Sequence, residues 1–159
     1  MTGVVVNLKD RVREADCESL KAAVLELRAL ISLDRTTGAA PVRIYFAFNA
    51  AARARIAGCL DPAETASRRP PAAFALVAYD FPFALHMIEI AGRQVTKDRA
   101  KAIAALSAGL QGDMLQAAAE AVRIEARPVL AFDAAALKAA FFPQTQETLT
   151  HLYRLDLAA

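Results

Sequence analysis

Few residues of this chain have the types and spacing that acid–base or metal chemistry requires. Its two histidines, His86 and His151, stand alone, and a lone imidazole is more often a packed or half-exposed side chain than a base. Asp80, Asp133 and Asp156 each follow an apolar run, and no feature pairs two of them as general acid and base. Asp133 is most simply a helix N-cap, and Asp80 a turn residue. The sequence therefore predicts no catalytic side chain.

Thiols and glycines give no binding motif either. Cys17 and Cys59 form no C-x-x-C pair and have no histidine nearby, so neither zinc nor redox chemistry is expected. Gly109 and Gly112 are not a phosphate loop, because no Lys-Ser/Thr pair follows and they lie within a predicted helix. Together with Ala105, they are expected to let another helix approach closely. No metal site is predicted.

The bulk composition limits the class of protein. A chain of 159 residues suits one domain, residues 1–159, that buries roughly 68–70% of its unfolded surface. The net charge of +2 comes from basic residues scattered in pairs, which gives no support to nucleic-acid binding. The N-terminus, MTGVVVNLKDR, lacks the pattern of a signal peptide, so a cytoplasmic protein is expected. A hydrophobic content of 56% and a mean hydropathy of +0.28 favour dimerisation.

The stretch Thr96–Phe142 organises the rest of the chain. It predicts a long helix over Ala100–Val122, a tight turn, and a second helix entered through Phe132 and Asp133. The long helix is apolar nearly all round, so it must be buried, and charges interrupt it too often for a membrane span. We expect it to lie against a second copy of the chain. Its apolar residues at three- and four-residue steps are Ile103, Leu106, Leu110, Met114, Leu115, Ala118 and Val122.

The remaining segments predict strands that alternate with helices, which indicates an α+β domain of two or three layers. Val42–Phe48, Phe74–Tyr79 and Thr148–Leu157 are typical of strands, and the second is expected to be covered on both faces. In the last strand, the residues expected on one face are Leu149, His151, Tyr153 and Leu155. Helices are predicted over Cys17–Leu33, from Asn49 to Leu60, at Asp61–Glu64 with a capping box, over Phe81–Ala91 and from Ala134 to Phe142, while Val4–Leu8 is a short strand or an arm.

Several segments resemble one known family. Leu110–Phe142, LQGDMLQAAAEAVRIEARPVLAFDAAALKAAFF, is similar to the core of FMN-dependent nitroreductases, especially the malonic semialdehyde reductase-like branch. In that core, S-L-Q-G-A-Y-L leads into A-L-G-L-D-x-G-P-M-S-G-F-D and then a helix ending in A-F-F, and the register is shared without a gap. PVRIYFAF resembles the family's first core strand. PPAAFALVAYDFPF resembles its S-A-P-V-T-A-I-V-A-Y-D-x-x-F segment.

The resemblance implies a fold and a cofactor. The fold would be α+β and nitroreductase-like, a central mixed or antiparallel sheet flanked by helices, with a long buried central helix at a dimer interface. FMN would lie at that interface and would take its electrons from NAD(P)H. The residues aligned with the family's flavin contacts are Thr36, Thr37, Arg127, Pro128, Val129 and Leu130.

The aligned flavin site departs from the family pattern. The two glycines of G-P-M-S-G stand as Arg127 and Ala131, Leu130 stands at the serine, and Leu106 stands at an expected arginine. The basic N-terminal motif reads VVVNLK, and the C-terminal arm has no counterpart. Because glycine lets a backbone approach the ring closely, the bulk of Arg127 and Leu130 is expected to narrow the cleft.

Three functions remain open. The first is an FMN-dependent NAD(P)H oxidoreductase that acts on a small electrophile such as a nitro compound, quinone or aldehyde. The second is a flavin-free relative that keeps the fold and the homodimer and binds another ligand or a partner. In the third, the chain is the inactive subunit of a mixed dimer with an intact paralogue.

Overall fold

The computed structural model describes most of the chain from Val42 onwards. The described residues are 42–65, 69–92 and 94–158, with Glu18, Ser19, Ala22 and Leu25, which are helical as predicted. The other positions of the helix predicted for Cys17–Leu33, the segment Val4–Leu8, and the aligned residues Thr36 and Thr37 lie outside the described residues.

Four antiparallel strands form one sheet in the order β1-β2-β4-β3. β2 (Ala73–Asp80) and β4 (Glu147–Leu157) are the central pair, and β1 (Val42–Ala47) and β3 (Ile124–Pro128) are the edges. β2 is buried along its first six residues, as predicted for a strand covered on both faces.

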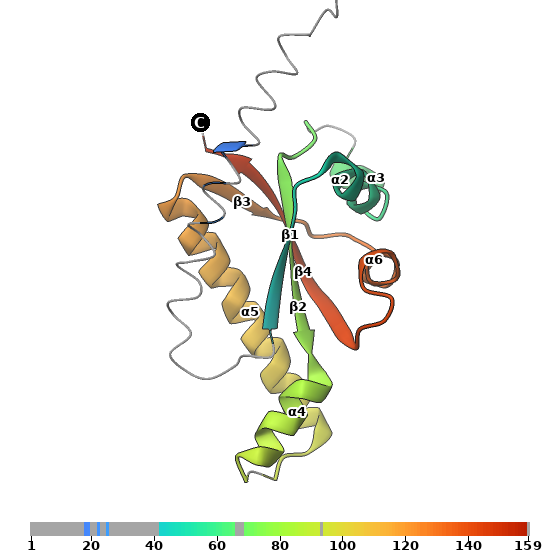
Figure 1. Cartoon of the computed structure of the whole chain (residues 1–159), viewed down its shortest axis with the longest axis vertical. Helices are drawn as coiled ribbons and strands as arrows, with labels where there is room; N and C mark the ends of the chain where they lie inside the picture. Colours follow the sequence, from blue (N-terminus) through green and yellow to red (C-terminus); the bar gives the residue numbers. More distant parts are fainter. Residues whose placement is uncertain are drawn as a thin grey trace, which may run out of the picture.

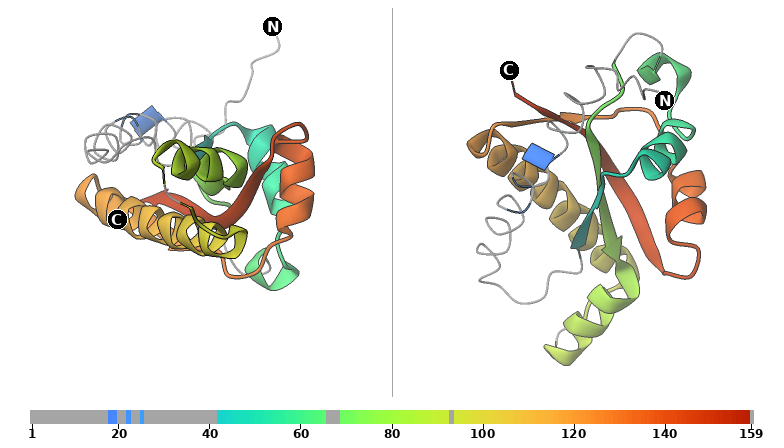
Figure 2. Two further views of the ribbon diagram at one scale, coloured as in Figure 1. Left: turned by 90° about the horizontal axis from the view of Figure 1, so that it is seen from below. Right: turned by 45° about the horizontal axis from the view of Figure 1, so that its top comes forward.

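Helices cover both faces of this sheet, so the domain has three layers (Figures 1 and 2). α5 (Lys97–Ala121) runs along one face, and α2 (Ala50–Ala57), α3 (Pro62–Thr65) and α6 (Ala134–Phe141) lie on the other. α4 (Phe81–Ile90) extends beyond the end of the sheet and packs against α5. The predicted α+β class is confirmed.

Each face of the sheet has its own hydrophobic core. The core towards α5 contains Val42, Ala73, Ala75, Val77, Ala108, Leu115, Ala119, Ile124, Tyr153 and Leu155. The core towards α2 and α6 contains Ala47, Ile56, Phe74, Leu76, Ala78, Val129, Leu137, Leu149 and Leu152. Neighbouring residues of β2 alternate between the two cores, as the two-residue period of a strand requires.

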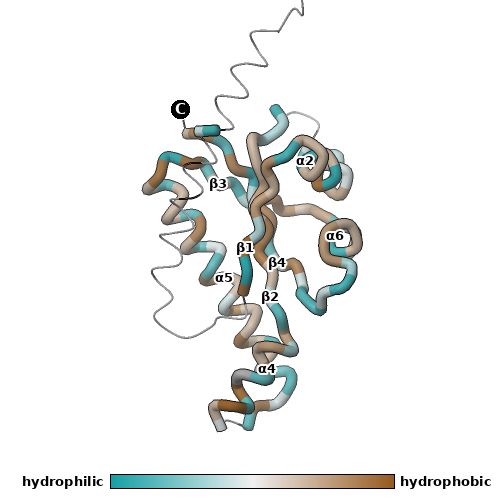
Figure 3. Tube along the Cα trace, viewed as in Figure 1, coloured by the Kyte–Doolittle hydropathy of each residue, from teal (hydrophilic) through white to brown (hydrophobic). Residues whose placement is uncertain are grey.

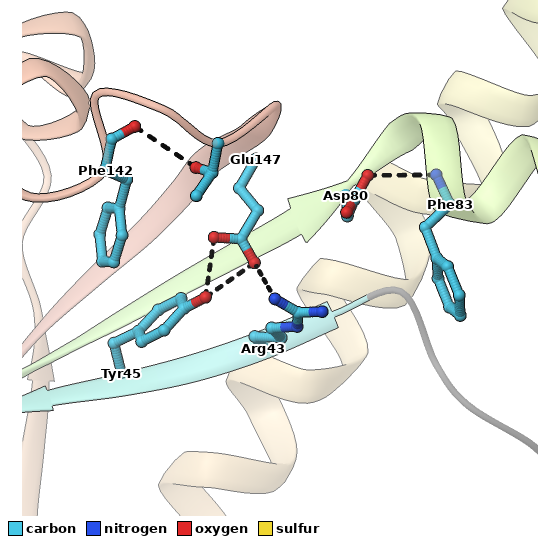
Figure 4. A network of polar contacts seen from close by, with 7 residues as sticks. Arg43, Tyr45, Asp80, Phe83, Phe142 and Glu147 are labelled. Atoms are coloured by element: carbon cyan, nitrogen blue, oxygen red, sulfur yellow. Dashed lines mark hydrogen bonds and ion pairs between the residues drawn. The ribbon is translucent and has the colours of Figure 1, made fainter.

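Side-chain oxygens cap the starts of several helices. The Asn49 side chain accepts a hydrogen bond from the Ala52 N–H at 2.7 Å and starts α2, although this helix ends at Ala57, before the predicted Leu60. The Asp133 carboxylate accepts from the Ala136 N–H at 2.9 Å and starts α6, as predicted. Asp80, predicted as a turn residue, also accepts from the first turn of a helix, α4, at the N–H of Phe83 (3.1 Å; Figure 4).

The capping box predicted at the start of α3 is wrong in its second half. The Asp61 carboxylate accepts from the Ala63 N–H at 2.8 Å, as an N-cap does. The Asp61 N–H, however, donates to the Ala131 carbonyl at 3.1 Å, and Oε1 of Glu64 accepts from the Leu130 N–H at 3.3 Å. Both groups are used to hold a distant loop, a role that the local motif could not reveal.

β3 replaces the tight turn that was predicted after the long helix. Arg123 adopts a φ of 60°, the chain reverses, and β3 pairs with β4 from Leu157 back to Tyr153. The prediction of a turn was wrong because a strand of 5 residues carries a weak local pattern. This strand is formed by pairing with a segment far along the chain.

A β-bulge in β4 divides the residues that were predicted to share one face. The pairing of β2 with β4 shifts register once, and Thr150 is the extra residue. Leu149 therefore belongs to the core towards α2 and α6, whereas Tyr153 and Leu155 belong to the core towards α5. The prediction was wrong because it assumed unbroken alternation.

α5 turns its small residues to the sheet and its large ones away from it. The buried positions of α5 are Ala100, Ala104, Ala108, Gly112, Leu115 and Ala119. Ile103, Leu106 and Leu110 keep 44%, 67% and 55% of their surfaces exposed. Hydrophobic positions recur along the whole helix in Figure 3. A single chain therefore buries only one side of α5, because alanines suffice for close packing on the sheet, and the expectation that a second copy covers the other side stays a prediction.

Gly112 makes room for a strand and not for the second helix that was predicted. A Cβ atom at this position would collide with the Tyr153 hydroxyl of β4, while Gly109 faces open space. None of the described helices carries an apolar stretch of the length needed to cross a bilayer.

Candidate cofactor cleft

Two loops joined by a short antiparallel ladder form the candidate site. Leu60, just after α2, pairs with Phe132, just before α6. On either side of this bridge, the Asp61 N–H donates to the Ala131 carbonyl at 3.1 Å and the Asp133 N–H donates to the Cys59 carbonyl at 2.8 Å. The loop that follows β3 is thereby fixed against the end of α2.

A cleft of about 560 Å³ lies along this ladder, within the size range of small-ligand sites. The Cys59 thiol lines the cleft, is half-buried and donates to the Arg55 carbonyl at 3.4 Å. Asp61 and Asp133 also line the cleft, but their carboxylates cap α3 and α6. The lining residues are Gly58, Cys59, Leu60, Asp61, Leu130, Ala131, Phe132, Asp133 and Ala136.

The four described residues that align with the family's flavin contacts lie in different surroundings. Leu130 lines the cleft and is 86% exposed. Val129 is buried in the core and donates its N–H to the Leu152 carbonyl at 2.8 Å. Pro128 ends β3 and is exposed. The Arg127 side chain is exposed, and its Nε donates to the Glu125 carboxylate at 2.7 Å. Only Leu130 of these four lies in the cleft.

A polar cluster of Arg43, Tyr45 and Glu147, which the sequence did not predict, joins β1 to β4 (Figure 4). Glu147 is 2% exposed, and its two carboxylate oxygens each lie 2.7 Å from the Tyr45 hydroxyl. Arg43 donates to the same carboxylate at 3.1 Å. Burial, reinforced by the hydrogen bond to Glu147, raises the pKa of Tyr45. The hydrogen bond with Tyr45 and the charge of Glu147 raise the pKa of Arg43.

The geometry of this polar cluster indicates a structural role. Glu147 pairs with Asp80 of β2, and its side chain reaches diagonally across β2 to β1, where Arg43 pairs with Ala78. Every oxygen of the carboxylate has a partner, as a buried charge requires. Within the described ranges, no three His, Cys, Asp or Glu side chains are placed to hold a metal ion.

Comparisons with known proteins identify the fold. No family sequence profile matches the chain, and no curated protein matches its sequence. A solved structure from Bacillus subtilis, described as nitroreductase ydfN, matches with a TM-score of 0.67 over 87% of this chain and 78% of its own, at 15% identity. The chain has the nitroreductase fold.

Two further structures with the nitroreductase fold agree with this result. One is described as an NAD(P)H:FMN oxidoreductase from Staphylococcus epidermidis, with a TM-score of 0.66, 10% identity, and 87% of this chain and 77% of that chain covered. The other is CLA-ER, an enone reductase of gut-bacterial fatty acid saturation, with a TM-score of 0.61, 12% identity, and 99% and 81% covered. The resemblance to the malonic semialdehyde reductase-like branch stays a prediction.

The nitroreductase-type loop in this chain fits one part of a flavin and not another. The exposed side chains of Pro128, Leu130 and Ala131 offer an apolar surface on which a planar ring can rest. The ring also needs hydrogen-bond partners along its polar edge. Here the N–H groups of Val129 and Leu130 already donate to other parts of the chain. These residues would therefore hold FMN mainly by apolar contact.

Proposed function

We propose that this chain is an NAD(P)H oxidoreductase of the nitroreductase type, with FMN as a loosely held cofactor. The observation that supports it best is the set of exposed apolar side chains of Pro128, Leu130 and Ala131, beside a cleft in a fold shared with a protein described as an NAD(P)H:FMN oxidoreductase. A bound FMN supplies hydride transfer, from the nicotinamide to a small electrophile such as a nitro compound, quinone or aldehyde. The chain's own contribution is to position the ring and to exclude water from one of its faces.

The same proposal includes a homodimer that pairs through α5. Ile103, Leu106 and Leu110 form an exposed apolar stripe on the side of α5 away from the sheet. Exposed apolar side chains gathered on one helix face favour association, because pairing removes them from water. A second copy of α5 presents a matching stripe, as a twofold interface requires.

Loose binding follows from the hydrogen bonds of the loop. Leu130 donates its N–H to Glu64 at 3.3 Å, so a flavin has to compete with a carboxylate for this donor. Arg127 is held by Glu125 and does not reach the cleft. We expect the protein to purify with little flavin and to regain turnover only when FMN is added.

The test is a titration of the purified protein with FMN, followed by flavin fluorescence and by NAD(P)H oxidation with quinones, nitroaromatics and short aldehydes. Saturable binding in the micromolar range, with turnover that rises along the same binding curve, would support the proposal. No saturable FMN binding at 1 mM would overturn it.

The second candidate is a flavin-free protein that keeps the fold and acts as a ligand-binding or interaction subunit, alone or in a mixed dimer with an intact paralogue. The bond from Leu130 to Glu64 and the ion pair of Arg127 with Glu125 favour it, because both occupy groups that a cofactor would use. A stable homodimer without FMN binding would support a flavin-free homodimer. An obligate monomer that pairs only with a co-expressed paralogue would support the mixed dimer.

A further inference from the structure

A second hollow, distinct from the cofactor cleft except for Leu60 at its edge, lies between α2 and the segment that leads into β2. Its volume is about 380 Å³, large enough for a single-ring ligand. Most of its wall is apolar, and two arginines from different elements reach it, Arg53 of α2 and Arg154 of β4. The other lining residues are Ala50, Ala54, Ala57, Leu60, Thr65, Pro70, Pro71 and Phe74.

Arg154 brings a buried positive charge to this pocket. It is 6% exposed, and its terminal nitrogens donate to the carbonyl oxygens of Glu64 at 3.2 Å and Arg69 at 2.6 Å. Carbonyl oxygens satisfy hydrogen-bond donors but carry no net charge. A buried charge is ordinarily paired with an opposite charge, and the carbonyl partners of Arg154 do not supply one.

Arg53 brings an unused donor to the same pocket. One terminal nitrogen of its guanidinium donates to the Pro71 carbonyl at 2.9 Å. Its Nε is shielded from solvent and has no hydrogen-bond partner within the described part of the chain. Buried donors in folded proteins are nearly always paired, so an unpaired one calls for an explanation.

A third arginine lies on this side of the sheet. Arg127 of β3 pairs directly with Arg154 of β4, so both side chains leave the sheet on the same face. Like charges placed opposite one another on neighbouring strands are unfavourable. Glu125 pairs with Arg127, whereas neither Arg53 nor Arg154 forms an ion pair with any described residue.

We propose that this pocket binds a small organic anion, a carboxylate or phosphate monoester that carries an apolar group. The anion lies between Arg53 and Arg154, where it neutralises the buried charge and accepts the free Nε–H of Arg53. The apolar part packs on Pro70, Pro71 and Phe74. This site is separate from the proposed flavin function and does not depend on it.

The test uses the full chain without added flavin, in a Bis-Tris buffer of low ionic strength, with three single-ring probes. Benzoate and phenyl phosphate carry the required charge, and benzamide is the neutral counterpart of benzoate. Calorimetric titration is expected to show saturable binding of at least one anion and at least tenfold weaker binding of benzamide. Benzoate as the tighter probe would assign a carboxylate ligand, and phenyl phosphate a phosphate monoester.

Variants of Arg53 separate recognition from folding. Arg53→Gln is expected to weaken binding of the preferred anion at least tenfold, and Arg53→Lys to restore part of it, because the lysine keeps the charge. Arg99→Gln removes an exposed arginine of α5 and is the matched control, which should bind as the wild type does. Circular dichroism checks that each variant is folded.

Two results would overturn the proposal. One is equal binding of benzoate, phenyl phosphate and benzamide, or binding of none of them. The other is wild-type affinity in a folded Arg53→Gln variant. An FMN titration of the same Arg53→Gln protein keeps the two proposals apart, because loss of the anion site is expected to leave flavin binding unchanged.

Discussion

The Tyr153 hydroxyl of β4 lies against the backbone of Gly112, a buried position of α5. Tyr153 is 4% exposed, and burial raises the pKa of its hydroxyl, with a smaller contribution from the negative charge of Asp113. A glycine in a helix is therefore retained here because a large side chain of another element fills the space that its Cβ would occupy.

Two glycine substitutions in α5 are expected to have opposite effects. Gly112→Ala should lower the free energy of unfolding by about 1–3 kcal/mol, because the new Cβ meets the Tyr153 hydroxyl. Gly109→Ala should raise it by up to about 1 kcal/mol, because its Cβ enters open space and alanine favours a helix. Urea unfolding measures both. In a Tyr153→Phe background the nearest remaining ring atom is 3.4 Å away, so the Gly112→Ala cost should largely disappear. An unchanged cost there would contradict the explanation.

Stability is expected to fall in alkaline solution through the two buried tyrosines. The native state raises the pKa values of Tyr45 and Tyr153, while in the unfolded chain a tyrosine keeps its ordinary pKa of about 10. The contribution of the two tyrosines to the free energy of unfolding is complete below that pH. It is lost as pH rises through the higher native pKa, because the unfolded chain releases its protons first. Tyr153→Phe should flatten the curve of unfolding free energy against pH above about 10, and a curve parallel to that of the wild type would count against this account.

The bond between Tyr45 and Glu147 should contribute measurably to stability. Tyr45→Phe removes a donor from a carboxylate that is only 2% exposed, so we expect a loss of about 1–3 kcal/mol. Glu147→Gln keeps the shape and removes the charge. In a double-mutant cycle measured by urea unfolding, a coupling energy of about 1 kcal/mol or more is expected, since the two groups are in contact. Strictly additive effects would show that the hydroxyl and the carboxylate act independently.

A charge on the exposed face of α5 should disrupt the proposed dimer. Leu106 is 67% exposed in a single chain, and Leu106→Glu would place a carboxylate within the paired stripe. We expect this substitution to make the free energy of association less favourable by about 2–4 kcal/mol, which sedimentation equilibrium would detect as a shift to monomer. Ala139→Glu, on the exposed surface of α6 across the sheet, is the control and should leave the oligomeric state unchanged. A dimer that tolerates Leu106→Glu must use another surface.

Freeing the loop N–H should strengthen flavin binding. Glu64→Ala removes the acceptor for Leu130, and one net hydrogen bond of about 1 kcal/mol corresponds to roughly fivefold tighter FMN binding. Fluorescence titration measures this change. Glu125→Ala is the comparison, since it removes an acidic partner of Arg127 outside the cleft and should change FMN affinity little. Equal effects of the two substitutions would mean that only the lost negative charge matters.

The candidate site could be predicted only in part. The resemblance predicted flavin contacts in the loop Arg127–Leu130, and only Leu130 of these residues reaches the cleft. The opposite wall, Gly58–Asp61, was missed because its link to the loop is a backbone bridge between segments that share no local pattern. The pocket of Arg53 and Arg154 was missed for the same reason, because its two cations meet only when α2 packs beside β4.

The sequence by itself determined the features that depend on neighbouring residues. The continuous apolar run of β2, the caps at Asn49 and Asp133, and the long helix over α5 follow from side-chain period and local hydrogen bonds. The tertiary structure alone decided which side of α5 is buried. In a helix rich in alanine, both sides are apolar. The side with the small residues packs on the sheet, because small side chains let the helix lie closer to the strands than Leu106 would.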